Sequence, residues 1–117
     1  MKKSLRLKDY VQHILQAIER IEDYCEDETE LSFLNNEMLQ DAVVRNLEII
    51  GEASNNILKK CPDFAAQHPD LPLKSAYEMR NAVAHGYFAV DWEMVWATTQ
   101  ENLPEFYAQL KQIELPE

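Results

Sequence analysis

The sequence predicts an all-α protein, an up-and-down bundle of four main helices joined by short connections. Apolar residues recur at spacings of three and four over long segments, which is the pattern of amphipathic helices. The chain has 117 residues but only 2 glycines and 5 prolines, so many short strands joined by tight turns are not expected. This length predicts one domain, residues 1–117.

The first helix is expected over residues 7–24, because apolar side chains form one stripe there. The stripe consists of Leu7, Tyr10, Val11, Ile14, Leu15, Ile18 and Ile21. The acidic segment EDYCEDETE comes next. We interpret it as the end of the helix and a solvated run of charge.

A second, longer helix is expected from a cap at Asn35 or Asn36 to about Lys60. Its core face consists of Leu39, Val43, Leu47, Ile50, Ile57 and Leu58. Gly51 lies in the middle of this helix, where glycine costs about 1 kcal/mol relative to alanine. The usual reason for such a glycine is another backbone that passes close by, and we expect one here.

Residues 61–72 contain three prolines and are expected to form a connector with one helical turn around Phe64. The third helix is expected to begin after Pro72 and to include LKSAYEMRNAVAH. Gly86 follows at the position that favours a left-handed conformation, so it is expected to stop this helix.

Asp91 is expected to cap the fourth helix. Its apolar stripe consists of Val95, Trp96, Thr99, Leu103, Phe106, Leu110 and Ile113. Pro104 lies inside this stripe, so it is expected to kink the helix rather than to end it. The amount of apolar helix surface also suggests a homodimer.

The net charge is −10, from 11 Lys and Arg against 21 Asp and Glu. Broad nucleic-acid binders are usually basic because they neutralise phosphates, so the charge argues against broad binding but leaves room for a small positive site. No run of about 18 apolar residues and no secretory signal is present, which suggests a cytoplasmic protein without a membrane helix. Cys25 and Cys61 are expected to be reduced thiols that pack as small hydrophobic residues.

The segment RNAVAHGY gathers a guanidinium, an amide, an imidazole and a phenol around the end of the third helix. Arg80 and His85 are about 140° apart on an intact helix, whereas Asn81 and His85 are neighbours at i and i+4. Arginine binds phosphate oxygens and histidine transfers protons near neutral pH. These groups suit RNA cleavage without a metal, in which His85 moves a proton and Arg80 stabilises charge on the phosphate.

A structural interpretation of the same residues remains open, because the spacing alone is weak evidence. Arg80 would then form a salt bridge with Glu48 or Glu52, and His85 would favour the negative end of the helix dipole. Arg45, Glu48 and Glu52 share one face of the second helix. We expect that face to border the motif, either supporting the site or only positioning Arg80.

A two-histidine mechanism would need a second imidazole, which the other subunit of a symmetric dimer would supply. His13 in the first helix and His68 in the connector have no partner at the spacing of metal ligands. Neither a metal nor a cofactor is therefore expected.

RNAVAHGY resembles the R-x4-H-x-Y signature of the HEPN superfamily, and specifically of HepT-like proteins, once called DUF86. AVVRNLEIIGEASNNI is similar to the second helix of that family, and RNAVAHGYFAVDWEMVWATTQENLPEF is similar to its motif helix and last helix. The resemblance therefore covers most of the chain from Asp41 to Leu110. One departure is visible: LPL precedes the motif helix where the family usually has Ile-Pro-Trp, so Leu73 replaces the tryptophan.

The resemblance implies an all-α homodimer that acts as an endoribonuclease toxin of a type VII toxin–antitoxin pair. The antitoxin would be a small MNT-type nucleotidyltransferase that transfers AMP onto the motif tyrosine. By position, Arg80 and His85 would be catalytic, Tyr87 would be modified, and Asn81 would position the site. The alternative is a non-catalytic helical module that scaffolds or presents substrate to a nucleotidyltransferase.

Overall fold

The computed structural model describes residues 2–85 and 90–115, with the side chains of residues 2–5 and 85 excepted. In chain order the elements are α1 (Lys2–Cys25), α2 (Glu30–Leu34), α3 (Glu37–Lys60), α4 (Pro62–Gln67), α5 (Leu73–His85), α6 (Trp92–Ala97), the π-helical η1 (Thr98–Asn102) and α7 (Leu103–Gln112). The described residues contain helices and no strand, so the predicted all-α class is confirmed.

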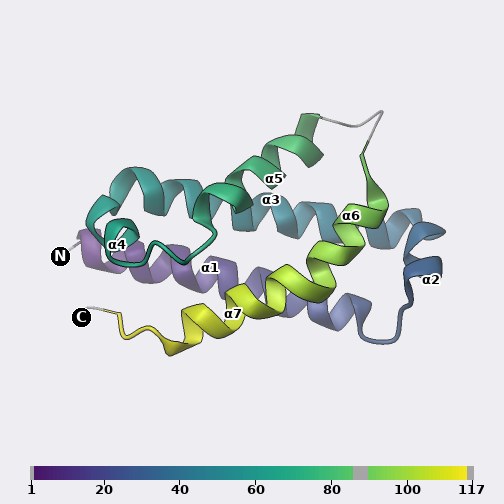
Figure 1. Ribbon diagram of the computed structural model, residues 1–117, viewed down its shortest axis with the longest axis horizontal. Helices are drawn as coiled ribbons and strands as arrows, with labels where there is room; N and C mark the ends of the chain where they lie inside the picture. The colour runs from purple at the N-terminus through teal and green to yellow at the C-terminus, as the bar shows by residue number, and fades with distance from the viewer. Residues whose placement is uncertain (1, 86–89, 116–117) are drawn as a thin grey trace.

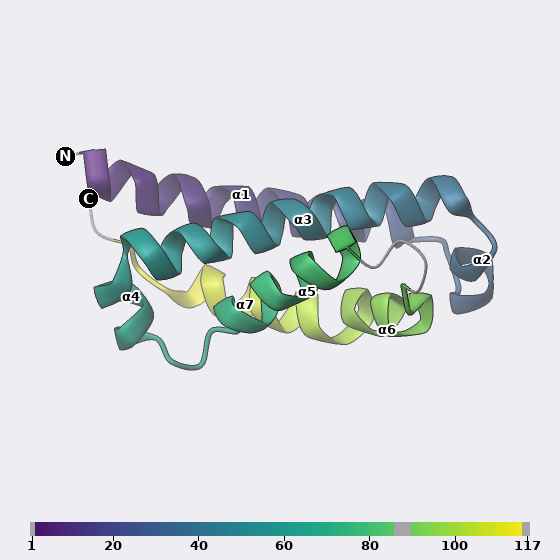
Figure 2. The same ribbon diagram turned by 90° about the horizontal axis from the view of Figure 1, so that it is seen from above.

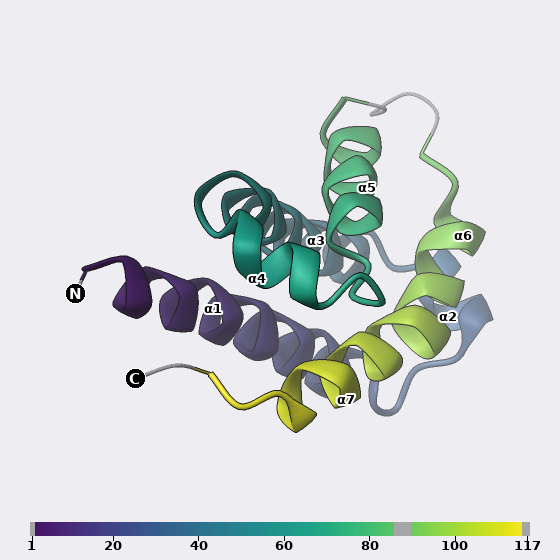
Figure 3. The ribbon, with the colours of Figure 1, turned by 60° about the vertical axis from the view of Figure 1, so that its left-hand side comes forward.

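The four long segments run alternately up and down, as predicted. Helices α1 and α3 lie side by side along the length of the molecule, and α5 packs on α3 (Figure 1, Figure 2). The continuous α6–η1–α7 segment returns along the other side and reaches α1 through α7. Figure 3 shows α5 in the upper part of the view and α7 in the lower part, with their ribbons apart.

Side-chain caps confirm two of the predicted helix starts, those of α3, where Asn36 is the one of the two candidates that caps, and of α6. Helix α1 begins at Lys2, earlier than the predicted residue 7. Asn36 Oδ1 accepts a hydrogen bond from the Leu39 N–H at 3.0 Å, and Asp91 Oδ1 accepts one from the Met94 N–H at 3.1 Å. Each cap satisfies a donor that the first turn of a helix leaves without an intrahelical partner. The connector also forms its predicted helical turn, which is α4 with Phe64 buried.

The core is built from the apolar stripes that the sequence predicts. Its fully or almost fully buried members include Val11, Ile14, Ile18 and Ile21 of α1, Val43, Leu47, Ile50 and Ile57 of α3, and Val95, Leu103, Phe106 and Leu110 of the last segment. Cys25 is buried and Cys61 is partly buried, and both are free thiols. Burial raises the pKa of each thiol, which disfavours the reactive thiolate.

The short helix α2 is a feature that the sequence does not predict. It begins just where the acidic segment ends, and its Phe33 is fully buried. The Phe33 ring lies 6.1 Å from the ring of Trp92 and 5.4 Å from that of Trp96. The region is therefore more than a solvated run of charge, because α2 fastens one end of the bundle to α6.

A reciprocal cap at Thr29 starts α2, and we expect its loss to weaken this end of the bundle. Thr29 Oγ1 accepts from the Ser32 N–H at 3.1 Å, and Ser32 Oγ accepts from the Thr29 N–H at 2.8 Å. Thr29→Ala should lower the free energy of unfolding by about 1 kcal/mol, measured by urea titration with tryptophan fluorescence. Thr29→Ser keeps the hydroxyl and should be close to wild type. Equal stability of the two variants would show that the cap contributes nothing.

The last helix continues through Pro104, as predicted, but its irregularity lies before the proline. The Leu103 N–H donates to the Thr98 carbonyl, five residues back, which makes η1 a π-helical turn. A proline ring clashes with the carbonyl four residues earlier in a regular α-helix. The wider π turn accommodates Pro104 in the first turn of α7. In the part of the chain that the structure describes, no helix is long and apolar enough to cross a membrane.

Candidate active site

Arg80 lies on α5 and reaches across α3. Its Nη2 donates to Glu52 Oε2 at 3.2 Å and forms a salt bridge. Its Nη1 donates to Asn81 Oδ1 at 3.0 Å. The side chains are 28% exposed for Arg80 and 53% exposed for Glu52, so the pair lies at the surface where ion pairs stabilise little. Its main effect is to fix the position of the guanidinium.

Gly51 makes this position of Arg80 possible. A Cβ at Gly51 would overlap the Cβ of Arg80, lie 2.8 Å from its Cγ and lie 2.9 Å from the Ala76 carbonyl oxygen. Helix α5 therefore crosses α3 at the glycine, which confirms the close approach of a second backbone expected there. The arginine stem lies directly on the α3 backbone, and only its head reaches Glu52.

Arg80 borders a pocket of about 290 Å³ between α1, α3 and α5. The pocket is lined by Tyr10, His13, Arg45, Glu48, Ile49, Glu52, Ala53, Asn56 and Arg80. Arg45, Glu48 and Glu52 were expected to lie next to the motif helix. Their position around one pocket with Arg80 of that helix confirms this. Of the two carboxylates weighed as partners of Arg80, Glu52 forms the salt bridge.

Three lining residues with polar side chains were not among the candidate site residues: Tyr10, His13 and Asn56. Tyr10 and His13 are three apart, so they share a face of α1, but chain spacing does not tell which part of α1 lies opposite Arg45. His68 does not line this pocket, and its ring packs on Phe64 with 4.6 Å between ring centroids.

The rest of the motif extends beyond the described part of the chain. His85 is the last residue of α5, but its side chain lies outside the description, as do Gly86 and Tyr87. The roles of His85 and Tyr87, and the stop at Gly86, therefore stay predictions. Asn81 is described, and its bond to Arg80 is what a positioning residue would make.

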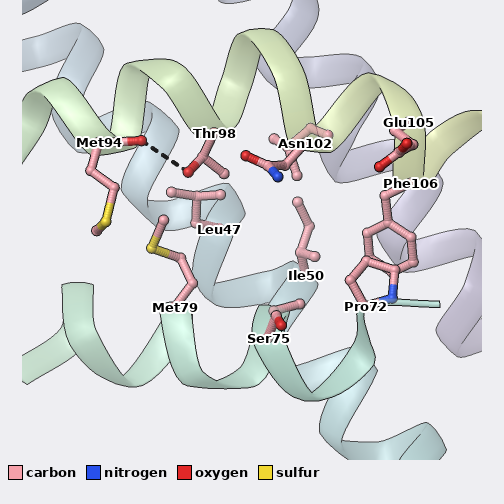
Figure 4. A pocket seen from close by; sticks show the side chains of 12 residues that line it. Leu47, Ile50, Pro72, Ser75, Met79, Met94, Thr98, Asn102, Glu105 and Phe106 are labelled. Atoms are coloured by element: carbon pink, nitrogen blue, oxygen red, sulfur yellow. Dashed lines mark hydrogen bonds between the residues drawn. The ribbon is translucent and has the colours of Figure 1, made fainter. Parts of the chain in front are cut away.

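A second concave surface, of about 360 Å³, lies between α5 and the α6–α7 segment, with α3 as its floor. Figure 4 shows Leu47 and Ile50 on the floor, Met79 on one wall and Met94 on the other. This groove is mainly apolar and lacks the arginine and histidine that phosphate chemistry needs. The chemistry of the protein is therefore better placed in the pocket beside Arg80.

Within residues 2–85 and 90–115 no group of three or more His, Cys, Asp and Glu residues is arranged to hold a metal ion.

Residues 14–113 match the family model described as "Ribonuclease HepT-like". The chain is 39% identical over 106 residues to "Probable ribonuclease HepT" of Thermococcus cleftensis, covering 91% of this chain and 94% of that protein. It is 35% identical over 106 residues to a "Putative RNase" of Caldanaerobacter subterraneus, covering 91% and 92% respectively.

A third relative is longer than this chain. It is the Methanocaldococcus jannaschii protein named "Gamma-glutamylcyclotransferase and putative RNase", 37% identical over 107 residues. The match covers 92% of this chain but only 47% of that protein. No solved structure matches the chain. Because the family model spans most of the chain and two relatives match over nearly their full length, the chain belongs to the ribonuclease HepT-like family.

Proposed function

We propose that the chain is a metal-independent endoribonuclease with Arg80 and His85 as its catalytic pair. The observation that carries this proposal is the fixed position of Arg80, bound to Glu52 and Asn81 at the rim of a polar pocket. The names of the relatives, which are those of ribonucleases, support the same reaction class.

Arg80 keeps the donors that a phosphate needs. A guanidinium has five N–H groups, and the bonds to Glu52 and Asn81 use one on each terminal nitrogen. Three N–H groups remain, one each on Nε, Nη1 and Nη2. The Nε atom is buried, so the two on the terminal nitrogens are the donors left for two phosphate oxygens. Because the guanidinium is held in advance, little reorganisation is needed as charge develops on the phosphate.

His85 would supply the proton transfer. It would remove the proton of the ribose 2′-hydroxyl, and the 2′-oxygen would attack the phosphorus as the bond to the 5′-oxygen breaks. The leaving 5′-oxygen would take a proton from a second acid, for which His85 of the partner subunit is the candidate in a homodimer. The products would be a 2′,3′-cyclic phosphate and a 5′-hydroxyl.

We also propose that the protein is the toxin of a type VII toxin–antitoxin pair, neutralised by AMP transfer onto Tyr87 from an MNT-type nucleotidyltransferase. Tyr87 is two residues after His85, so an added AMP would place a bulky anion close to the catalytic pair. That anion would compete with RNA for Arg80 and would repel its phosphates.

The alternative function is a non-catalytic module that presents substrate to a nucleotidyltransferase. Two observations favour it: the net charge of −10 and the salt bridge that already engages Arg80. In this case Arg80 would act only as a link between α5 and α3.

Induced expression separates the two functions. Wild type should stop growth and produce new RNA fragments on a gel, whereas His85→Ala should do neither and should still fold, because its change is at the end of α5. Mass spectrometry should confirm that Tyr87 is unmodified in the wild-type sample. Equal growth and intact RNA with both proteins would reject catalysis and favour the binding module.

A further inference from the structure

The pocket beside Arg80 has more polar groups than phosphate binding requires. Apart from the Arg80–Glu52 pair, its side chains bring a guanidinium from Arg45, a carboxylate from Glu48, an amide from Asn56 and an imidazole from His13. Among the described residues these four side chains form no hydrogen bond or ion pair with the protein. Their donors and acceptors are therefore available to a ligand.

The charges of the pocket favour a ligand with more than an anionic group. Glu48 and Glu52 lie in the same pocket as Arg45 and Arg80, so the formal charges balance and the carboxylates are acceptors that an isolated phosphate or sulfate would leave unused. A fitting ligand has an anionic part for a guanidinium and hydrogen-bond donors for a carboxylate. A nucleotide has both, because its base carries N–H donors beside an anionic backbone.

The remaining lining groups suit a flat heterocycle. Tyr10 and His13 bring two rings from one face of α1, and such rings are the usual stacking partners of unpaired bases in RNA recognition. Asn56, which lines the pocket from α3, has both a donor and an acceptor for a base edge. The volume of about 290 Å³ leaves room for a ligand rather than for water alone.

We infer that this pocket is a base-recognition subsite for the RNA nucleotide next to the phosphate bound by Arg80. Glu48 accepts a hydrogen bond from the exocyclic amino group of the base, which uracil lacks. The N3–H donor of uracil lies between two carbonyl oxygens that a carboxylate repels, so adenine, cytosine and guanine are preferred over uracil. The inference rests on the proposed function, because Arg80 belongs to both sites. Two of the residues that form the subsite, Tyr10 and His13, lie before residues 14–113, which the family model matches.

Binding is tested with the purified full chain and four probes, AMP, CMP, GMP and UMP, by amide NMR titration. The three nucleotides with an exocyclic amino group should shift the resonances of residues around Tyr10, His13, Glu48 and Asn56, and UMP should bind several-fold more weakly. Shifts confined to other surfaces, or equal binding of all four nucleotides, would overturn the inference.

Cleavage provides the second readout, with RNA oligonucleotides that differ at one base beside the cut. Glu48→Gln replaces a carboxylate, which only accepts hydrogen bonds, with an amide of the same shape that both donates and accepts. The ratio of the cleavage rates for the other three bases and for uracil, several-fold in the wild type, should therefore fall toward one. His13→Ala should weaken binding of all four bases. Two matched controls outside the pocket, Glu37→Gln on α3 and His68→Ala after α4, should leave the base preference unchanged.

The two proposals fail in different ways. If wild type cleaves RNA but Glu48→Gln keeps the wild-type base preference, the subsite is wrong and the ribonuclease stands. If nucleotides bind at Tyr10, His13 and Glu48 with the stated preference but RNA is never cut, the subsite stands and the catalytic function fails.

Discussion

Arg80→Ala is expected to lower the rate of RNA cleavage by about 10²–10³, as removal of one preorganised donor to a developing negative charge does in other enzymes. The structure gives the physical reason: the guanidinium is held by Glu52 and Asn81 with further N–H groups free for a phosphate. Stability should change much less, because a partly exposed ion pair contributes at most about 1 kcal/mol.

The measurement is single-turnover cleavage of a defined RNA, with thermal unfolding of each variant measured in parallel. Arg80→Lys keeps the charge but loses the planar pair of donors, so its rate should lie between those of wild type and Arg80→Ala. If Arg80→Ala instead retains almost all activity and loses stability, Arg80 is a structural link to Glu52 and has no part in the chemistry.

Gly51→Ala is the second change with a large expected effect. Helix propensity alone would predict that it raises the free energy of unfolding, whereas we expect it to lower it. Alanine in the middle of a helix is favoured over glycine by about 1 kcal/mol. Here its Cβ would overlap the Arg80 Cβ and approach the Ala76 carbonyl oxygen to 2.9 Å. Neither atom is the free end of a flexible side chain, so α5 itself must shift away from α3.

We expect a net loss of about 1–3 kcal/mol in the free energy of unfolding, as for other overpacked sites. Cleavage should fall as well, because the shift moves Arg80 away from Glu52. Urea unfolding and the cleavage assay of the same preparation measure both effects. A stabilised Gly51→Ala protein would mean that α5 does not pass over the glycine as described.

The features that could be predicted from sequence are those that local spacing determines. The stripes of α1 and α3, the caps at Asn36 and Asp91, and the close approach at Gly51 all follow from residue type and period. For the salt bridge of Arg80 the sequence allows two partners, because Glu48 and Glu52 share a face of one helix. The crossing of α5 over Gly51 is consistent with Glu52, the next residue, as the actual partner.

The features that could not be predicted depend on contacts between distant parts of the chain. Helix α2 has five residues, too few for a periodic pattern, and the burial of Phe33 depends on Trp92 and Trp96 about 60 residues later. Tyr10 and His13 join the candidate site only because of the register in which α1 packs on α3. The sequence pattern says that α1 packs with one face but does not fix this register.

Metal-independent catalysis by His85 is tested most directly by cleavage of an end-labelled RNA with the purified, unmodified chain in the presence of EDTA, wild type beside His85→Ala. We expect the wild type to cut the RNA without a divalent metal and to leave 2′,3′-cyclic phosphate and 5′-hydroxyl ends, and His85→Ala to leave it intact. Cleavage that requires a metal ion, cleavage that persists in His85→Ala, or no cleavage by the wild type would contradict metal-independent catalysis by His85.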